Sequence, residues 1–156
     1  WLKWEYHLPP WQRAREHFTA HKSEYVRFAE LLRRDSSARF VGSDGTVYTG
    51  AIHSRLVPAY RELAHTLGVK HVVIGDDGSM EFAIWGMGGP LMSDSYLGVR
   101  YYPKDRTVDT RPGYAPNIVA SLDSDKLPQE NGSVASGLYT VVIDPEWSIY
   151  RFEYQE

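Results

Sequence analysis

Two histidines four residues apart, His17 and His21, are the first side chains whose spacing could do chemistry. On a helix such a pair shares one face and could give a metal ion two ligands, but a site needs a further ligand from elsewhere in the fold. His21 also falls between Phe18 and Tyr25 on an apolar stripe, which favours a histidine at the edge of the core. The chain has no cysteine, so thiolate metal sites, thiol nucleophiles and disulfides are excluded. We therefore predict no metal and no cofactor.

The glycine-rich segment Gly86–Ser95 is the second candidate. Glycines leave backbone N–H groups accessible, and such groups bind anions or a developing oxyanion. The sequence lacks the Gly-Lys-Ser/Thr of phosphate loops and the Gly-x-Ser-x-Gly of hydrolase nucleophiles. Ser93 or Ser95 would act as a nucleophile only if His53 or His71 lay within hydrogen-bond reach, which the sequence does not decide. A small hydrolase or ligand-binding enzyme with its site at Gly86–Ser95 is the alternative function.

Aromatic side chains are more informative than these motifs, since the chain has 11 Tyr, 5 Trp and 5 Phe. Alternation along a predicted strand at 147–154 puts Tyr150 and Phe152 on one face of the sheet and Trp147 on the other. If helices cover one face, the other leaves Tyr or Trp exposed, and such rings are the usual anchors of protein interfaces. Alternatively, the rings form cross-strand pairs that only stabilise the sheet. The residues predicted to bind a partner are Trp85, Met87, Ser93, Asp94, Tyr96, Tyr102, Trp147 and Tyr150.

The net charge of −3 is unevenly divided along the chain. Residues 1–70 carry 11 Lys and Arg against 7 Asp and Glu, a net of +4, whereas residues 71–156 carry 6 against 13, a net of −7. Nucleic-acid binding needs a basic surface, but the basic residues of the positive half, 1–70, belong mostly to one predicted helix and are expected to form its solvated face. We therefore expect no nucleic-acid partner, and the acidic second half favours a basic protein partner.

Apolar periodicity predicts the elements that position these side chains. Helical spacing predicts helices over about 10–34 and 55–67. Turn residues predict hairpins around 43–45 and 76–79, and a last hairpin that pairs 137–143 with 147–154. A glycine-rich loop is expected at 86–94, a strand at 95–102, and an irregular stretch at 103–136 with a short strand at 117–122. The fold class is α+β: a single domain with a twisted, mainly antiparallel sheet of about six to eight strands and the two helices packed on one face.

Residues 1–9 form a separate aromatic segment, with Trp1, Trp4 and Tyr6 beside Lys3. Trp and Tyr next to a Lys are typical of the bilayer–water interface beside a membrane-spanning helix. One hypothesis is that a signal peptide or membrane anchor precedes Trp1, which gives a membrane tether and favours the periplasm or cell envelope over the cytoplasm. The other is that these rings pack on the core of the α+β domain, which we place at 10–156.

Together these features favour a non-enzymatic protein-binding domain. Many aromatic residues, acidic loops and the lack of a catalytic motif give it the composition of small inhibitor or toxin-neutralising, immunity-like proteins. A structural part of an envelope assembly is a third hypothesis. The hydrolase alternative requires a histidine and a carboxylate to converge on the 86–95 segment in a pocket, whereas the binding function requires an accessible surface with rings.

Overall fold

The structure is a computed structural model that describes residues 11–36, 38–47, 55–89, 92–103, 117–118, 129–130, 133–134 and 137–154. The predicted aromatic segment 1–9, with its anchor hypothesis, lies outside the described residues, as does most of 103–136. Within these ranges, every helix is too short or too polar to cross a membrane.

In the described part of the chain, seven strands form one sheet in the order β1-β2-β3-β4-β9-β8-β5. Their bounds are β1 Phe40–Gly42, β2 His71–Ile74, β3 Met80–Gly89, β4 Met92–Tyr101, β5 Asn117–Ile118, β8 Gly137–Val142 and β9 Trp147–Tyr154. Neighbouring strands pair antiparallel apart from β5, which is parallel to β8, and a separate ribbon pairs β6 (Gln129–Glu130) with β7 (Ser133–Val134). The hairpins predicted at 76–79 and before 147 are confirmed, and the turn at 43–45 brings Val47 beside Val41.

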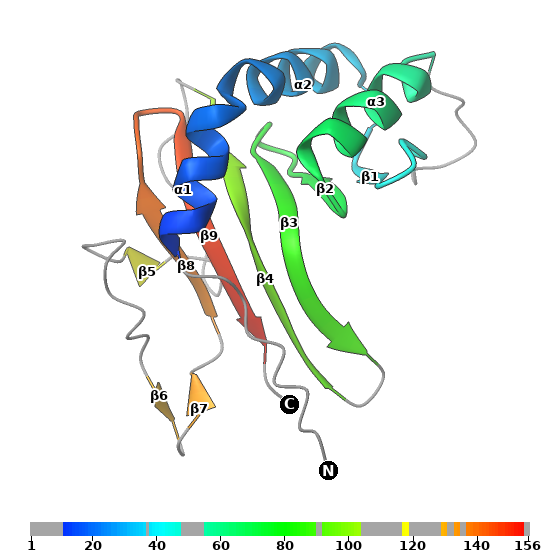
Figure 1. Ribbon diagram of the computed structural model, residues 1–156. Helices are drawn as coiled ribbons and strands as arrows, with labels where there is room; N and C mark the ends of the chain where they lie inside the picture. Colours follow the sequence, from blue (N-terminus) through cyan, green and yellow to red (C-terminus); the bar gives the residue numbers. More distant parts are fainter. Residues whose placement is uncertain are drawn as a thin grey trace.

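The glycine-rich stretch does not form the loop that its composition predicted. β3 continues to Gly89 and β4 begins at Met92, so the predicted loop is the end of a long hairpin. The pairing register of β3 and β4 shifts after Ala83 and again after Met87. At each shift one strand contains more residues than the strand opposite, which is a β-bulge. A bulge bends its strand and increases the local twist. Figure 1 shows the resulting curvature of β3 and β4.

Three helices form in the described ranges: α1 (Trp11–Ala20), α2 (Lys22–Arg34) and α3 (Val57–Leu67). The prediction of one continuous helix over 10–34 was wrong, because the backbone leaves the helical region at His21, with φ −121° and ψ 22°. Between Phe18 and Tyr25 the sequence has no large apolar side chain. The break lets α1 contact β4 and β9 while α2 lies across the end of the sheet beside α3 (Figure 1). The helix predicted at 55–67 is confirmed as α3, which ends at Gly68 with φ +69°.

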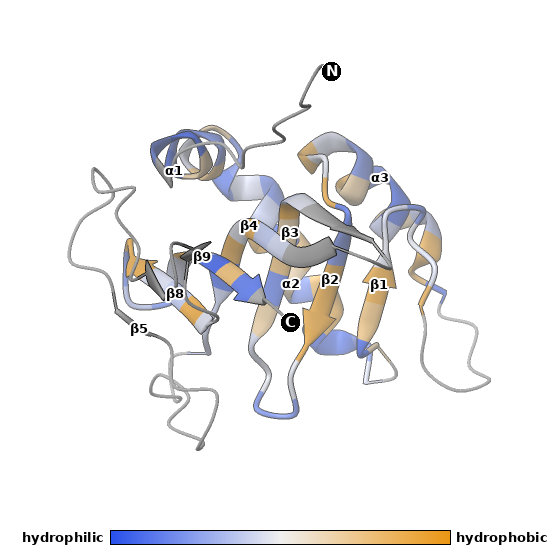
Figure 2. Cartoon of the chain, turned by 90° about the horizontal axis from the view of Figure 1, so that it is seen from below, coloured by the Kyte–Doolittle hydropathy of each residue, from blue (hydrophilic) through white to orange (hydrophobic). Residues whose placement is uncertain are grey.

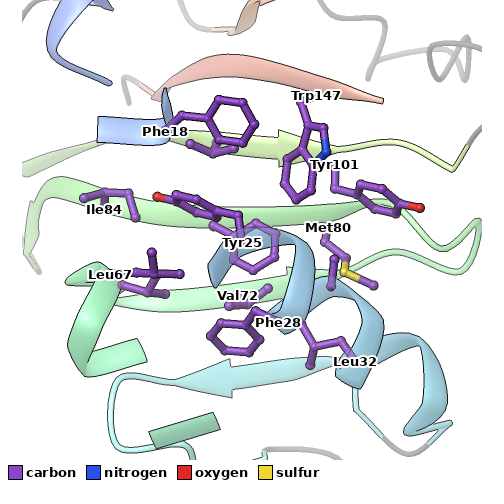
Figure 3. Packing of buried hydrophobic residues seen from close by; sticks show 14 of the residues in the cluster. Phe18, Tyr25, Phe28, Leu32, Leu67, Val72, Met80, Ile84, Tyr101 and Trp147 are labelled. Carbon is purple, nitrogen blue, oxygen red and sulfur yellow. The ribbon is translucent and has the colours of Figure 1, made fainter. Parts of the chain in front are cut away.

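An aromatic core fills the space between the helices and one face of the sheet (Figure 3). The Tyr25 ring meets Phe82 edge to face with centroids 5.5 Å apart, and the Phe18 ring lies 5.2 Å from Trp147. Seen from below, α1 and α3 lie on the same side of the sheet (Figure 2). The predicted α+β domain, with helices on one face of a mainly antiparallel sheet, is therefore confirmed. None of the three described helices covers the opposite face, which we call the helix-free face.

Two core tyrosines differ in what their hydroxyl groups meet. The Tyr60 hydroxyl donates a hydrogen bond to Asp35 Oδ2 at 2.9 Å, which ties α3 to the end of α2. The Tyr25 hydroxyl is buried without a hydrogen-bond partner in the described part of the chain, and burial raises the pKa of this phenol far above its usual value. Tyr25 therefore stabilises the core through its ring, whereas its buried hydroxyl lowers the stability of the fold because it makes no hydrogen bond in the described part of the chain.

Candidate protein-binding surface

A row of rings crosses the sheet on the helix-free face. Phe40 of β1 stacks on His71 of β2 with centroids 5.3 Å apart, and His71 meets Tyr96 of β4 edge to face at 5.0 Å. Tyr96 in turn stacks on Phe152 of β9 at 6.4 Å. All four side chains are half-buried, so each keeps part of its surface in contact with solvent. We call these four residues the aromatic row.

The row is continuous because β3 contributes a glycine at this level of the sheet. Gly86 pairs with Tyr96, between the rings of β2 and β4. A Cβ on Gly86 would lie 2.5 Å from Cδ1 of the Tyr96 ring, so the ring occupies the space that a side chain on β3 would need. Tyr96 thereby reaches across β3 to His71. Its neighbour Leu97 points to the opposite face and is fully buried in the core, as strand alternation requires.

The same face carries two well-exposed aliphatic side chains. Val73 is 38% exposed and Val142 is 55% exposed. Their chain neighbours Val72 and Val141 belong to the core, so alternation places Val73 and Val142 on the helix-free face. Single exposed apolar residues are ordinary, but Val73 pairs directly with Phe40 and extends the apolar surface of the row. A connected apolar surface of this kind is typical of interaction sites.

The histidine of the row is uncharged at neutral pH. Burial lowers the pKa of His71 below its usual 6.5, and the positive charge of Lys70 lowers it further. A neutral imidazole packs between Phe40 and Tyr96 as another flat ring. The row is therefore an uncharged aromatic surface under ordinary conditions, and acid would place a cation in its middle.

A buried polar cluster closes another part of the helix-free face. Arg100 Nε lies 3.4 Å from Glu81 Oε1, and the guanidinium lies over the Tyr102 ring at 4.5 Å from its centroid. Burial raises the pKa of the Glu81 carboxyl, an effect that the positive charge of Arg100 opposes. The Arg100 side chain is 5% exposed and that of Glu81 is 30% exposed, so the positive charge of the cluster is buried whereas the carboxylate is partly accessible. The cluster holds β3 and β4 together.

The predicted binding residues lie in different environments. Tyr96 is a member of the aromatic row. Trp85 is half-buried on the helix side, where its ring lies 5.8 Å from that of His17 on α1. Three residues lie in β3 or β4 near the end of the hairpin, with side chains outside the described part: Met87, Ser93 and Asp94. For these residues a binding role remains a prediction.

The other three predicted rings are buried, so none of them provides the exposed Tyr or Trp that was expected on the uncovered face of the sheet. Tyr102, Trp147 and Tyr150 are 7%, 5% and 2% exposed. Trp147 faces the helices and packs in the core. Tyr150 lies on the helix-free face, as alternation predicted, but opposite Gly98, whose Cβ would lie 3.0 Å from Tyr150 Cε1. The missing side chain lets the Tyr150 ring pack closely on the sheet, and burial raises the pKa of its hydroxyl well above the usual value.

Three members of the row were not among the predicted binding residues. Phe152 could have been found, because alternation put it on the same face as Tyr150. Phe40 and His71 belong to strands of three and four residues, too short to show a clear period. Their contact depends on the pairing of β1 with β2, in which Gly42 lies opposite His71. No local signal in the sequence fixes that register.

The catalytic alternative gains no geometric support from Ser95. Its hydroxyl donates to Glu153 Oε2 at 2.5 Å, and Glu153 Oε1 accepts a hydrogen bond from Arg151 Nε at 2.6 Å. Ser95 alternates with Tyr96 and therefore lies on the helix side of β4, whereas His71 lies on the helix-free face. The structure does not bring Ser95 and His71 together, and His53 lies outside the described residues.

His17 and His21 meet at the break between α1 and α2. Their ring centroids are 4.8 Å apart, and both His17 Nε2 and His21 Nδ1 are buried without a hydrogen-bond partner in the described part. His21 Nδ1 lies 3.9 Å from Glu24 Oε1. Across the described residues, no group of three His, Asp or Glu side chains is arranged to hold a metal ion. Burial and the proximity of His21 lower the pKa of His17, while a hydrogen bond to the Leu67 backbone at the end of α3 opposes this.

Comparison with known proteins gives no relative for this chain: no protein-family model, no curated protein and no solved structure matches it. The surface itself is therefore the basis for inferring a function.

Proposed function

We propose that this chain is a non-enzymatic protein-binding domain whose aromatic row contacts a basic protein partner. The observation that supports this best is the row itself, four rings in contact across the sheet on the face that the helices leave free. Rings held on strands provide a large contact area at a low cost in conformational entropy, because few torsions have to be fixed. Truncation of such rings is what most often abolishes binding at protein interfaces.

The chemistry of the row favours a partner that presents Arg or Lys among apolar side chains. The face of an aromatic ring attracts a cation, and Arg100 over Tyr102 at 4.5 Å is an example within this chain. Residues 71–156 carry 6 Lys and Arg against 13 Asp and Glu, which adds long-range attraction for a basic protein. An inhibitor or immunity-like role follows if the row covers a working surface of that partner. The envelope location and membrane tether remain proposals from residues 1–9.

Photo-crosslinking from the row tests this function. The photoreactive amino acid p-benzoyl-phenylalanine replaces Tyr96 in one variant and His65, which is exposed on α3, in a matched control. In cells that produce the chain, we expect a discrete product with a different, basic protein from position 96 and not from position 65. That protein is then purified, and its affinity is measured by calorimetry for the wild type, Tyr96→Ala, Phe152→Ala and His65→Ala.

We expect one-to-one binding that weakens about 30-fold in each row variant, since truncating an anchoring aromatic side chain costs roughly 2 kcal/mol. The His65→Ala variant should bind like the wild type, and circular dichroism should show that all variants are folded. Affinity should fall as salt is added, as expected for a basic partner. Equal affinity of all variants, or a crosslinked product made of two copies of this chain, would contradict the proposal.

A further inference from the structure

The break between α1 and α2 is a one-residue hinge at a histidine. The His21 N–H donates to both the His17 carbonyl oxygen at 3.1 Å and the Phe18 carbonyl oxygen at 3.2 Å, a shared hydrogen bond that is common at helix ends. The His21 carbonyl oxygen in turn accepts a hydrogen bond from the Tyr25 N–H inside α2. A single residue therefore separates two helices that run in different directions (Figure 1).

The two helices beside this hinge are held to the core unequally. Among the described side chains of α1, Ala14 and Phe18 are buried. The buried side chains of α2 are Tyr25, Phe28, Ala29 and Leu32. A helix of ten residues has little stability of its own in water, so α1 depends on its contacts with the sheet. We therefore expect α1 to come away from the core more easily than α2.

His17 holds its proton on the side of α3. Its ring is hydrogen-bonded to the backbone of Leu67, at the end of α3. Because His17 Nε2 is buried without a partner among the described residues, that hydrogen bond uses Nδ1. The neutral ring therefore carries its N–H on Nδ1 and its lone pair on Nε2, so acid adds a proton at the buried nitrogen. The charged neighbours of His17 on α1, Arg13 and Glu16, are exposed.

The surroundings of His17 are aromatic. Its ring centroid lies 4.8 Å from that of His21, 5.9 Å from that of Tyr25 on α2 and 5.8 Å from that of Trp85 on β3. The buried Tyr25 hydroxyl makes no hydrogen bond to His17. The histidine in the last turn of α3, His65, is exposed. A proton on His17 Nε2 would therefore sit among rings, beside a second imidazole.

Carboxylates near the hinge do not pair with His17. Glu24 Oε1 lies 3.9 Å from His21 Nδ1, so this carboxylate can pair with protonated His21. The sheet under α1 contributes Glu153, which already pairs with Arg151 at 2.6 Å. Within the described ranges no carboxylate forms an ion pair with His17, and the charge that acts on it, that of His21, opposes protonation.

We propose that this hinge is a pH-operated release for α1, in which a proton on His17 detaches α1 from the sheet while the rest of the domain stays folded. In the docked helix the proton creates a buried charge and a buried N–H group without an acceptor, both of which cost free energy. Release returns His17 to water and removes this cost. It also uncovers core rings, among them Trp147, whose centroid lies 5.2 Å from that of Phe18.

Hydrogen–deuterium exchange of the full chain tests this release. Exchange is followed by mass spectrometry from about pH 7.5 to about pH 5, with times scaled for the intrinsic exchange rate at each pH. Below the unfolded-state pKa of 6.5, we expect the opening constant of α1 to rise by up to about tenfold per pH unit, the limit for one proton. Peptides from α2 and β9 should keep their protection, and a return to neutral pH should restore that of α1.

Three variants identify the group that takes up the proton. His17→Gln keeps an N–H donor for the Leu67 backbone but cannot titrate, so it should abolish the pH dependence of exchange in α1. His65→Gln replaces an exposed histidine of α3 and is the matched control, which should behave like the wild type. His21→Gln removes the repelling charge, so it should move the release to a lower pH without abolishing it.

The wild-type profile decides the inference even if a variant fails to fold. Unchanged protection of α1 in acid, or a loss of protection shared equally by α1, α2 and β9, would overturn it. A folded His17→Gln variant with the wild-type pH dependence would overturn it as well. The inference goes beyond the proposed function and is independent of it, because Tyr96 and the crosslinking experiment concern the other face of the sheet.

Discussion

Replacing Gly98 with alanine should strongly destabilise the fold. A Cβ at Gly98 would lie 1.9 Å from the Phe82 carbonyl oxygen and 2.9 Å from the Phe82 carbonyl carbon. Both are backbone atoms of β3, so they cannot rotate away as a side chain could. The third near atom is Cε1 of Tyr150, at 3.0 Å. The methyl group therefore fits only if β3 and β4 move apart.

The size of the effect follows from this geometry. Forcing an extra methyl group into a packed site costs about 1–3 kcal/mol. Separating the strands also weakens the hydrogen bonds around the pair Ala83↔Gly98, each of which contributes about 1 kcal/mol net. We therefore expect Gly98→Ala to lower the free energy of unfolding by roughly 3–5 kcal/mol, a large part of the ~5–15 kcal/mol that holds a domain of this size together.

Urea unfolding followed by circular dichroism measures the loss, and Gly68→Ala is the matched control. Gly68 ends α3 with φ +69°, and no heavy atom lies within 4 Å of the position that an alanine methyl group would take there, so its replacement adds backbone strain without a clash. That strain costs about 1–2 kcal/mol. If Gly98→Ala costs no more than Gly68→Ala, the close approach of β3 to β4 at this point is wrong.

Tyr25→Phe should raise the free energy of unfolding by about 1 kcal/mol, because it removes a buried hydroxyl without a partner, whereas Tyr60→Phe should lower it by a similar amount; opposite signs in urea unfolding are the check. Folding lowers the pKa of His17, so the folded state favours the uncharged imidazole. The stability that this gives is fully present above the unfolded-state pKa of 6.5, and it is lost as the pH falls toward the lower pKa of the folded state. His17→Gln should therefore reduce the loss of stability between about pH 7 and pH 5, and an unchanged pH profile would show that His17 is not the group responsible. Glu81→Ala should lower the free energy of unfolding by about 3–5 kcal/mol, because it leaves Arg100 buried without its counter-charge. The double variant Glu81→Leu with Arg100→Met should regain most of this free energy, because it buries no charge. Thermal and urea unfolding of the single and double variants measure both effects.

Local signals in the sequence were sufficient for most of the fold. Asp-Gly at 77–78 gave the hairpin of β2 and β3, and Asp-Gly at 44–45 gave a tight turn whose described pairing is the single bridge Val41↔Val47; Gly45 and Gly78 both adopt the positive φ that such turns require. The helix break at His21 could not be predicted, because its cause is packing: α1 follows the sheet while α2 crosses its end. The strands at 80–85 and 95–102 were predicted, but the extension of β3 and β4 through the glycine-rich segment was missed. Glycines usually indicate a loop, but here Gly86 is in a strand because the Tyr96 ring leaves no room for a side chain.

The candidate surface was harder to predict than the fold. The rings of Tyr96 and Phe152 sit in long strands whose alternation is readable, but the row is completed by Phe40 and His71 from short strands paired at long range. Buried rings were mistaken for exposed ones for a similar reason. The exposure of a tyrosine on the helix-free face depends on the residue that pairs with it on the neighbouring strand. For Tyr150 that residue is Gly98, which leaves room for the ring to pack on the sheet.

Two glycines give neighbouring parts of one face opposite properties. At Gly98 the missing side chain lets Tyr150 pack down on the sheet, so the centre of the helix-free face is closed and the central strands are buried on both sides. At Gly86 the missing side chain lets Tyr96 reach across β3 and keep a half-exposed ring in line with its neighbours. Rigid strands therefore hold an accessible row, and rings that are already fixed lose little entropy when a partner covers them. For these reasons we propose the row as the surface that binds another protein.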